Sequence, residues 1–238
     1  MGQLDNQAVV VIGGTSGIGL ATAVAAAAEG ARVFAASSSA EKVAAAGAAH
    51  PGITFTQVDV HDREGLASAF AGIGPVDHIV SAATGANRTT RPFLEQSDDQ
   101  FRAAFEKFWG YNNVVRAGAP HLTANGSITL VSGIPARKCN PNMSSISCVG
   151  SAVEGLTRAL AIELAPQRVN VVAPGIIDTG MFAGLGDNKA AMLAQMGKSI
   201  PLGRVGAATE VAAAIMLCVT NGFMTGATID VDGGALLP

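Results

Sequence analysis

The chain of 238 residues and 23.8 kDa is long enough for one large α/β domain or two small ones. Its residues are 49% hydrophobic and only 14% charged, which excludes intrinsic disorder and indicates much covered surface, in a two-faced sheet or in subunit contacts. The net charge of −3 and the lack of any Lys/Arg run exclude nucleic acid as the expected partner.

Cysteine and histidine usage gives no sign of a disulfide framework or a metal site. The three cysteines contain no Cys-x-x-Cys pair, and the four histidines are scattered without ligand spacing. The N-terminus shows no signal-peptide pattern, and no window approaches the roughly 18 apolar residues of a membrane span. We therefore expect a cytoplasmic protein with no bound metal, no membrane partner and no nucleic-acid partner.

Short apolar runs alternate with longer helical patterns along the chain. Strands are predicted over 8–12, 31–36, 53–58, 77–80, 127–131, 169–172 and 228–231, and helices over 18–29, 40–46, 62–70, 98–119, 143–164 and 208–219. Unbroken apolar strands that alternate with helices predict a parallel sheet covered on both faces. Because there is no internal repeat and no Pro/Gly/Ser-rich linker, we expect one domain over residues 1–238.

Residues 179–201 show the weakest pattern in the sequence. The segment holds four glycines, little strand pattern and only a weak helix around 188–196. A segment of this length between a strand and a helix is often a mobile lid over a site, and we predict a lid on the substrate side. An ordinary surface excursion is the alternative.

The first predicted strand leads directly into a glycine-rich turn that opens the first helix. Gly13 permits the tight turn, Gly17 and Gly19 allow backbone and helix to approach a pyrophosphate, and the free N–H groups of the helix start favour an anion. A strand before the turn and a helix after it form the context that this motif requires. The sequence therefore predicts a dinucleotide-binding domain. Its predicted contacts in the turn are Gly13, Thr15, Ser16, Gly17, Ile18 and Gly19.

The end of the second strand bears on the choice of nicotinamide cofactor. A carboxylate there binds the ribose 2′-hydroxyl of NAD, but this chain has Ser37-Ser38-Ser39. Hydroxyl groups can donate to a 2′-phosphate, and the helix that starts near Ala40 directs its positive end to the same place. NADP is therefore favoured over NAD, with Ser37 and Ser38 as contacts. A helix N-cap is the other interpretation of these serines, and both can hold together.

Further motifs extend over almost the whole sequence. They are Asp59-Val60, the segments 152–160 and 168–175, Thr179, Pro201-Leu202-Gly203-Arg204 and Val231-Asp232-Gly233-Gly234. With the spaced glycines, they make the chain resemble the short-chain dehydrogenase/reductase family. The resemblance implies a three-layer Rossmann fold with a seven-stranded sheet, a nicotinamide dinucleotide, and homodimers or homotetramers built through the long fourth and fifth helices. It also implies cofactor contacts at Asp59, Val60, Ala82, Ala83, Pro174, Gly175, Ile177 and Thr179.

The catalytic residues of that family are absent from the positions that the resemblance assigns to them. The family uses Tyr-x-x-x-Lys on the fifth helix, a serine before this pair and an asparagine on the fourth helix. Aligned without gaps, the tyrosine, lysine, serine and asparagine positions hold Ile146, Gly150, Gly133 and Lys107. No slipped register restores the pair, because the single tyrosine, Tyr111, has Val115 at the fourth place after it.

The loss of the tyrosine removes the usual proton donor while the cofactor motifs are kept. A positioned general acid typically contributes 10²–10⁴-fold in rate, so ordinary ketone reduction is disfavoured. One hypothesis is an NADP(H)-dependent oxidoreductase with a non-standard site that reduces an imine or an activated C=C bond. In a second, a substitute acid allows carbonyl reduction. In a third, the chain is a non-catalytic nucleotide-binding protein that acts as a sensor or a partner subunit.

Lys107 is the candidate for the substitute acid. Gly133 and Gly150 vacate volume, and the long side chain of Lys107 can enter the space of the missing lysine. Burial would then lower its pKa toward neutrality and make it a usable acid. The alternative is a helix lysine that faces solvent.

Other residues near this position leave the substrate open. Ser145, Ser147 and Cys148 flank the tyrosine position but face other sides of a helix, which favours packing roles. Arg137 and Lys138 either bind an acidic substrate or lie in water. Apolar residues nearby favour a small apolar substrate, although methionines also serve as flexible packing. They are Phe93, Phe182, Met143, Met181, Met192 and Met196.

Overall fold

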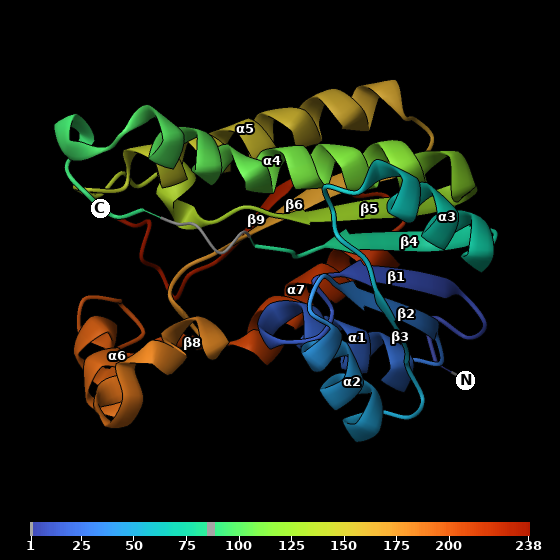
Figure 1. The fold of residues 1–238 in the computed structure, drawn as a ribbon, viewed down its shortest axis with the longest axis horizontal. Coiled ribbons are helices and arrows are strands. Elements are labelled where there is room, and N and C mark those ends of the chain that lie inside the picture. Colours follow the sequence, from blue (N-terminus) through green and yellow to red (C-terminus); the bar gives the residue numbers. More distant parts are fainter. Residues whose placement is uncertain (1, 85–88) are drawn as a thin grey trace.

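The structure, a computed structural model, describes residues 2–84 and 89–238, and it is built around one large sheet (Figure 1). All seven strands are parallel and lie in the order β3-β2-β1-β4-β5-β6-β9. Their bounds are β1 Ala8–Ile12, β2 Arg32–Ser37, β3 Thr54–Gln57, β4 Val76–Ser81, β5 Leu122–Val131, β6 Arg168–Pro174 and β9 Thr228–Val231. The expected doubly wound, seven-stranded sheet is confirmed.

Helices cover both faces of the sheet, so that the fold has three layers (Figure 1). One layer holds α3 (Arg63–Ile73), α4 (Asp98–Gly118) and α5 (Ser144–Glu163), and the other holds α1 (Gly17–Ala28), α2 (Ala40–Ala49) and α7 (Ala208–Thr220). The strand order reverses between the neighbours β1 and β4. Ligands of such sheets bind beyond the carboxyl ends of the strands at this reversal. The segments after β1, β4, β5 and β6 therefore form the expected site.

Strand β5 begins earlier than its apolar pattern predicts. The pattern starts at Ser127, whereas β5 starts at Leu122, which pairs with Val76 of β4. The register between β4 and β5 then shifts before His78 pairs with Ser127. The polar residues in between carry no apolar alternation, which is why the sequence pattern misses them.

The segment after β6 is more ordered than its sequence suggests. Strands β7 (Ile177–Asp178) and β8 (Gly206–Ala207) pair in parallel and close its base. Between them lie the 3-10 helix η4 (Gly180–Asn188) and helix α6 (Lys189–Gly197). The Nζ atom of Lys189 lies 2.7 Å from Oδ1 of Asp178 and fastens α6 to β7. In Figure 1, α6 and β8 stand apart from the two helical layers, at the lower left.

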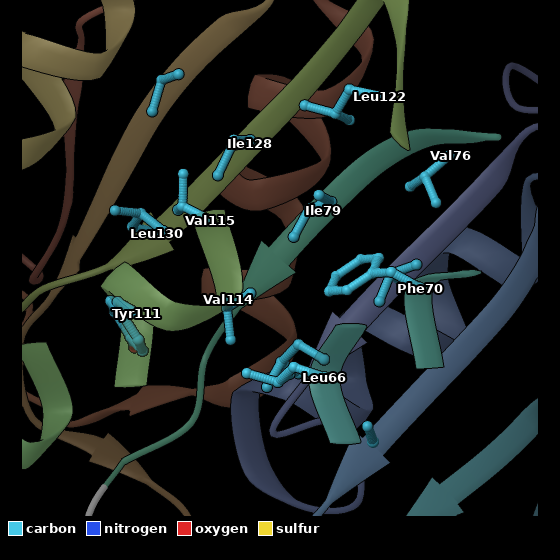
Figure 2. Packing of buried hydrophobic residues seen from close by; sticks show 14 of the residues in the cluster. Leu66, Phe70, Val76, Ile79, Tyr111, Val114, Val115, Leu122, Ile128 and Leu130 are labelled. Carbon is cyan, nitrogen blue, oxygen red and sulfur yellow. The ribbon is translucent and has the colours of Figure 1, made fainter. Parts of the chain in front are cut away.

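Apolar side chains fill both faces of the sheet, and Figure 2 shows the larger cluster. Leu66 and Phe70 of α3 and Val114 of α4 point toward the strands that carry Ile79 and Ile128. Three short 3-10 helices complete the fold: η1 (Phe93–Glu95), η2 (Ala119–His121) and η3 (Ile134–Ala136). In the part of the chain that the structure describes, no helix is both long and apolar enough to cross a membrane.

Candidate functional site

The glycine-rich turn after β1 packs tightly against the segment after β4. Gly13 has a φ of +82°, and a Cβ atom added to it would lie 2.6 Å from the backbone nitrogen of Ala83. A Cβ on Gly19 would lie 2.1 Å from the carbonyl oxygen of Gly13. Only glycine fits at either place. The turn therefore lies against Ala82 and Ala83 at the strand-order reversal.

The first turn of α1 is left open toward an anion. Its N-cap, Ser16, is exposed and makes no capping hydrogen bond, and no acidic side chain lies in the first turn. Such N–H groups and the helix dipole favour a bound phosphate. The methyl carbon of Thr179 lies 3.3 Å from the place of a Cβ on Gly17, so the predicted contact Thr179 borders the turn. Both residues line a pocket of about 520 Å³.

The other predicted cofactor contacts follow the carboxyl ends of neighbouring strands. Ser37 ends β2, and Ser38 follows it with an exposed side chain. Ser39 caps α2 through a 3.3 Å hydrogen bond from the backbone nitrogen of Lys42. The N-cap interpretation therefore applies to Ser39, while Ser37 and Ser38 remain predicted phosphate contacts. Asp59 and Val60 follow β3, with Asp59 exposed and Val60 half-buried.

The remaining predicted contacts lie on or beside β6 and β7 and in the glycine-rich turn with the start of α1. Pro174 ends β6, and the backbone nitrogen of Gly175 donates to the carbonyl oxygen of Val231 at 3.0 Å. Ile177 is buried in β7. Thr15 is buried in the glycine turn, and Ile18 is half-buried at the start of α1. The uncapped helix start and the close glycine contacts fit a dinucleotide along this edge.

The larger of the two described pockets, about 790 Å³, lies at the opposite edge of the sheet. Its lining includes His78 and Asp77, whose side chains are hydrogen-bonded within the chain. The buried His78 makes ring contacts of 2.8 Å to Ser127 Oγ and 2.7 Å to Gln7 Oε1. Asp77 accepts hydrogen bonds from the backbone of Ala8 and from Thr123. Since these groups satisfy one another, the pocket contains a structural polar cluster at the amino ends of the strands.

Lys107 of α4 points into the protein. Its side chain is half-buried, and Nζ donates a hydrogen bond of 3.1 Å to the carbonyl oxygen of Ser132, next to Gly133. The same ammonium group lies 5.4 Å from the ring centroid of Tyr111, one helical turn further on. The alternative of a solvent-facing lysine is therefore wrong. The sequence left this open because it does not fix the rotation of α4.

Three positions that the resemblance assigns to catalytic side chains, Gly150, Gly133 and Ile146, differ in their surroundings. A Cβ on Gly150 would lie 2.9 Å from the Cβ of Ala136, so η3 packs directly on α5 at this point. The expectation of vacated volume is therefore wrong at Gly150. A Cβ on Gly133 would meet Pro135 only at 3.4 Å, an ordinary contact, and Ile146 is half-buried in the first turns of α5.

The single tyrosine of the chain, Tyr111, lies inside the core and not at its surface. Tyr111 is fully buried, and its hydroxyl group donates to the carbonyl oxygen of Val131 at 3.1 Å. Burial raises the pKa of Tyr111 well above its ordinary value, which makes its phenol a weaker acid. Ser145 and Ser147 are buried, and their hydroxyls have no hydrogen-bond partner among the described residues, whereas Cys148 is exposed.

The sequence analysis missed a polar network behind the turn that follows β5. Ser132 Oγ donates to Glu154 Oε1 at 3.2 Å, and Arg137 Nε lies 3.4 Å from the same oxygen. Arg137 also pairs with Asp230 of β9, and this hydrogen bond, helped by the charges of Glu154 and Asp230, raises its pKa. The Nζ atom of Lys138 donates to the carbonyl oxygen of Ala235. Arg137 and Lys138 thus bind acceptors of their own chain.

Comparison with known proteins identifies the family. A family model described as enoyl-(acyl carrier protein) reductase matches residues 13–235. Carbonyl reductase family member 4 of Danio rerio is 32% identical over 237 residues, which cover 96% of this chain and 97% of the relative. The chain belongs to the short-chain dehydrogenase/reductase family of oxidoreductases, as its motifs predict.

Two solved structures with bound cofactor are similar over nearly the whole length. A small-chain dehydrogenase in complex with NADPH is 33% identical, with a TM-score of 0.84, and the match covers 98% of this chain and all of that one (100%). An NADPH-bound short-chain oxidoreductase from Pseudomonas aeruginosa PAO1, described as containing an atypical catalytic center, is 31% identical. Its TM-score is 0.90, and the match covers 97% of this chain and 98% of that protein.

Proposed function

We propose that this protein is an NADP(H)-dependent reductase that works without a Tyr/Lys pair and uses Lys107 in place of the missing acid. The observation that carries the proposal is the inward position of Lys107, whose Nζ lies 3.1 Å from the Ser132 carbonyl oxygen beside Gly133. The proposed substrate is small and apolar and contains an activated C=C bond. A neighbour described as having an atypical catalytic center supports a non-standard site.

NADP is the proposed cofactor. Both NADPH-bound neighbours support this choice, as do the serines in place of a carboxylate after β2. When bound, NADPH supplies a hydride. The residues expected to hold it are those of the glycine turn and the strand ends described above, with the first turn of α1 binding phosphate and Ser37 and Ser38 donating to the 2′-phosphate.

The chemistry left to the protein is the handling of a negative charge and a proton. Addition of hydride to a C=C bond conjugated with a carbonyl group places negative charge on the carbonyl oxygen. An ammonium group stabilises that charge strongly in a site of low dielectric, and Lys107 Nζ can then donate the proton. The charge on Lys107 disfavours a protonated imine, since like charges repel. An activated alkene therefore fits better than an imine.

Two further observations support this class of substrate. The matching family model carries the description enoyl-(acyl carrier protein) reductase, and an enoyl group is an activated C=C bond. Phe93, Met181 and Met192 keep exposed apolar surface in η1, η4 and α6. We propose that 179–201 is the substrate-side lid to which these methionines belong.

The proposal extends to a homodimer or homotetramer built through α4 and α5. Trp109 and Ile162, on these two helices, are exposed, and exposed apolar residues of this size often mark subunit contacts. Sedimentation analysis distinguishes the two assemblies from a monomer.

The experiment that tests the proposal is a turnover panel with NADPH. Conjugated enones, cyclic imines and simple ketones of similar size are compared, and enones are expected to react fastest. Lys107→Met is expected to lower kcat at least tenfold with an unchanged Kd for NADPH, and Lys107→Arg is expected to keep part of the activity through its charge. Arg116→Met, an exposed change on the same helix, is the control.

The same experiment can overturn the proposal. Unchanged turnover in Lys107→Met dismisses the role of this residue. Tight NADPH binding in a calorimeter, without turnover of any compound in the panel, favours the non-catalytic alternative of a sensor or a partner subunit.

A further inference from the structure

Ser132 is bonded in three directions at the end of β5. Its backbone nitrogen donates to the carbonyl oxygen of Val172 on β6 at 2.9 Å. Its hydroxyl group donates to Glu154 Oε1 at 3.2 Å, and its carbonyl oxygen accepts from Lys107 Nζ at 3.1 Å. Ser132, which accepts the hydrogen bond from Lys107, is thus itself held by β6 on one side and by α5 on the other.

The residue after Ser132 gives it no side-chain support. Gly133 has a φ of +157°, a conformation that other residues rarely adopt, and it has no side chain to pack. Beyond Gly133 the chain is held by contacts of its own, since the backbone nitrogen of Ala136 donates to the carbonyl oxygen of Gly133 at 3.0 Å. Without the hydroxyl contact to Glu154, the Ser132 peptide and its carbonyl oxygen would be held mainly through β6.

Glu154 is unusually placed for a charged residue. It is buried on α5, where an unpaired carboxylate would be costly. Arg137 Nε lies 3.4 Å from Glu154 Oε1, and the guanidinium group continues to Asp230 on β9, with one hydrogen bond of 2.9 Å. The carboxylate thus has one contact toward Ser132 and another toward a cation tied to the sheet edge. One hydrogen bond to the carboxylate and one ion pair fix its position better than packing alone.

We propose that Glu154, held by Arg137, is a positioning residue that acts through Ser132 to fix the ammonium group of Lys107. The proposal deepens the proposed function and rests on it for its effect on turnover. Its structural part, that Glu154 and Ser132 set the position of Lys107 Nζ, is independent of catalysis.

The chain offers a matched control for ordinary loop anchoring. Ser151 of α5 donates through Oγ to the carbonyl oxygen of Ala136 at 2.9 Å, so it fastens η3 to the same helix without touching Ser132. A hydrogen bond that matters only for the fold of this loop should behave like this one. Ser132→Ala and Ser151→Ala each remove one hydroxyl group from the two anchors.

The structural part is tested by NMR with protein labelled at lysine Cε. The chain has five lysines, and the Lys107 signal is identified by its loss in Lys107→Met. Ser132→Ala and Glu154→Gln are expected to shift the Lys107 signal in the absence of any substrate, whereas Ser151→Ala leaves it in place. An unmoved Lys107 signal in both Ser132→Ala and Glu154→Gln overturns the proposal, whatever the kinetics show.

The kinetic part uses the most reactive enone of the panel. Ser132→Ala is expected to lower kcat five- to tenfold with KM and the Kd for NADPH changed less than twofold. Glu154→Gln, which keeps an acceptor for Ser132, is expected to lose about threefold, and Glu154→Ala about tenfold. If Glu154→Ala does not fold, the other two variants still decide. If Ser132→Ala and Ser151→Ala lower kcat equally, Glu154 only anchors the loop after β5 and does not position Lys107.

The two proposals fail in distinguishable ways. If Lys107→Met leaves turnover unchanged while the Lys107 signal shifts in Glu154→Gln, the proposed function is wrong and the positioning is right. If Lys107→Met abolishes turnover while neither Ser132→Ala nor Glu154→Gln moves the signal, Lys107 is held by other contacts and the network has no part in the reaction.

Discussion

The turn after β1 and the turn after β5 lie at the same edge of the sheet but differ in whether their polar groups are hydrogen-bonded within the chain. In the first, the N-cap Ser16 makes no capping bond and the start of α1 is open to an anion. In the second, Ser132, Arg137 and Lys138 all bond to acceptors within the chain. The first region thus leaves a helix N-terminus open to an anion, whereas the second pairs its polar groups within the chain.

The same contrast appears in the glycines. Gly13 and Gly19 bring backbone against backbone in the turn that is predicted to bind a pyrophosphate. Gly150 instead lets Ala136 of η3 pack against α5. In the first region the glycines allow backbone to approach backbone, whereas in the second the glycine lets a neighbouring segment pack against a helix. The reaction, in the proposed function, then depends on the ammonium group that α4 brings to this second region.

The sharpest test of the first region is Ser16→Asp. A carboxylate at this N-cap should accept the free N–H groups of α1 and stabilise the fold by about 1 kcal/mol. It should also repel the pyrophosphate, at a cost of several kcal/mol for like charges near a protein surface. We expect NADPH binding to weaken about 100-fold while the free energy of unfolding rises, as measured by calorimetry and urea unfolding.

Ser97→Asp is the control for this change. Ser97 caps α4 with a 3.2 Å hydrogen bond from Gln100, so an aspartate there meets a helix start that is already satisfied. It should leave NADPH affinity unchanged. Equal NADPH affinity in the parent and in Ser16→Asp would show that the start of α1 does not bind the phosphates. The contrast drawn here between the two turns would then be wrong for the turn after β1.

The sequence predicts the first region well because its signals are local. The glycines, the strand before them and the helix after them lie within one short segment, and the packing at Gly13 and Gly19 follows from that order. The β-α alternation likewise predicts the sheet, although β7 and β8, with two residues each, are too short to leave a pattern.

The second region was beyond sequence analysis because its contacts join distant segments. Ser132 and Glu154 are 22 positions apart, and Arg137 and Asp230 are 93 positions apart. The inward direction of Lys107 depends on how α4 is rotated on the sheet, which its sequence pattern leaves open. The packing of Ala136 on Gly150 was missed for a similar reason, because the sequence around Gly150 does not show which other segment packs against it.

The pH range in which the two regions can be compared is limited by His78, because this side chain is buried in its neutral form and its protonation destabilises the fold. Burial lowers its pKa from 6.5 to about 4; nearby Arg168 acts in the same direction, and Asp77 opposes it. Below pH 6.5 the histidine is protonated in the unfolded chain but stays neutral in the folded chain. The free energy of unfolding therefore decreases as the pH is lowered from 6.5 to about 4. We expect urea unfolding to show a loss of about 2 kcal/mol between pH 7.5 and 5.

His78→Gln checks this assignment. Glutamine has no proton to gain in this range, so the pH dependence of its unfolding free energy should be about 2 kcal/mol smaller than that of the parent, even if the variant is less stable at pH 7.5. The same slope in both proteins would assign the loss to other groups. Activity comparisons between the two regions belong above pH 6.5 if the assignment holds.

Gly150→Lys tests whether the second region can be returned to the family's pattern. The new Cβ would lie 2.9 Å from Ala136, and overpacking of this kind typically costs 1–3 kcal/mol. Better helix propensity offsets a little under 1 kcal/mol, so we expect a net loss of about 1.5 kcal/mol in urea unfolding. Adding Ala136→Gly should recover part of it.

Gly72→Lys provides the matched comparison, because a Cβ on this glycine of α3 meets nothing within 4 Å. It should be neutral or slightly stabilising. If Gly150→Lys lowers the free energy of unfolding no more than Gly72→Lys, then η3 moves aside at little cost. The packing of η3 on α5 would then not be what disfavours a lysine at position 150.

The smallest expected effect comes from Tyr111→Phe, which separates the two donors that α4 directs at the end of β5. Tyr111 donates to the Val131 carbonyl and Lys107 to the next carbonyl along the chain, with the lysine also over the tyrosine ring. Removing the hydroxyl group should cost about 1 kcal/mol in urea unfolding. It keeps the ring beneath the ammonium group, so turnover with an enone should change less than twofold.

Tyr111→Leu removes the ring as well and should weaken turnover further. A tenfold loss in Tyr111→Phe would mean that the phenol, although buried, belongs to the reacting region, and the assignment of the acid to Lys107 would have to be given up.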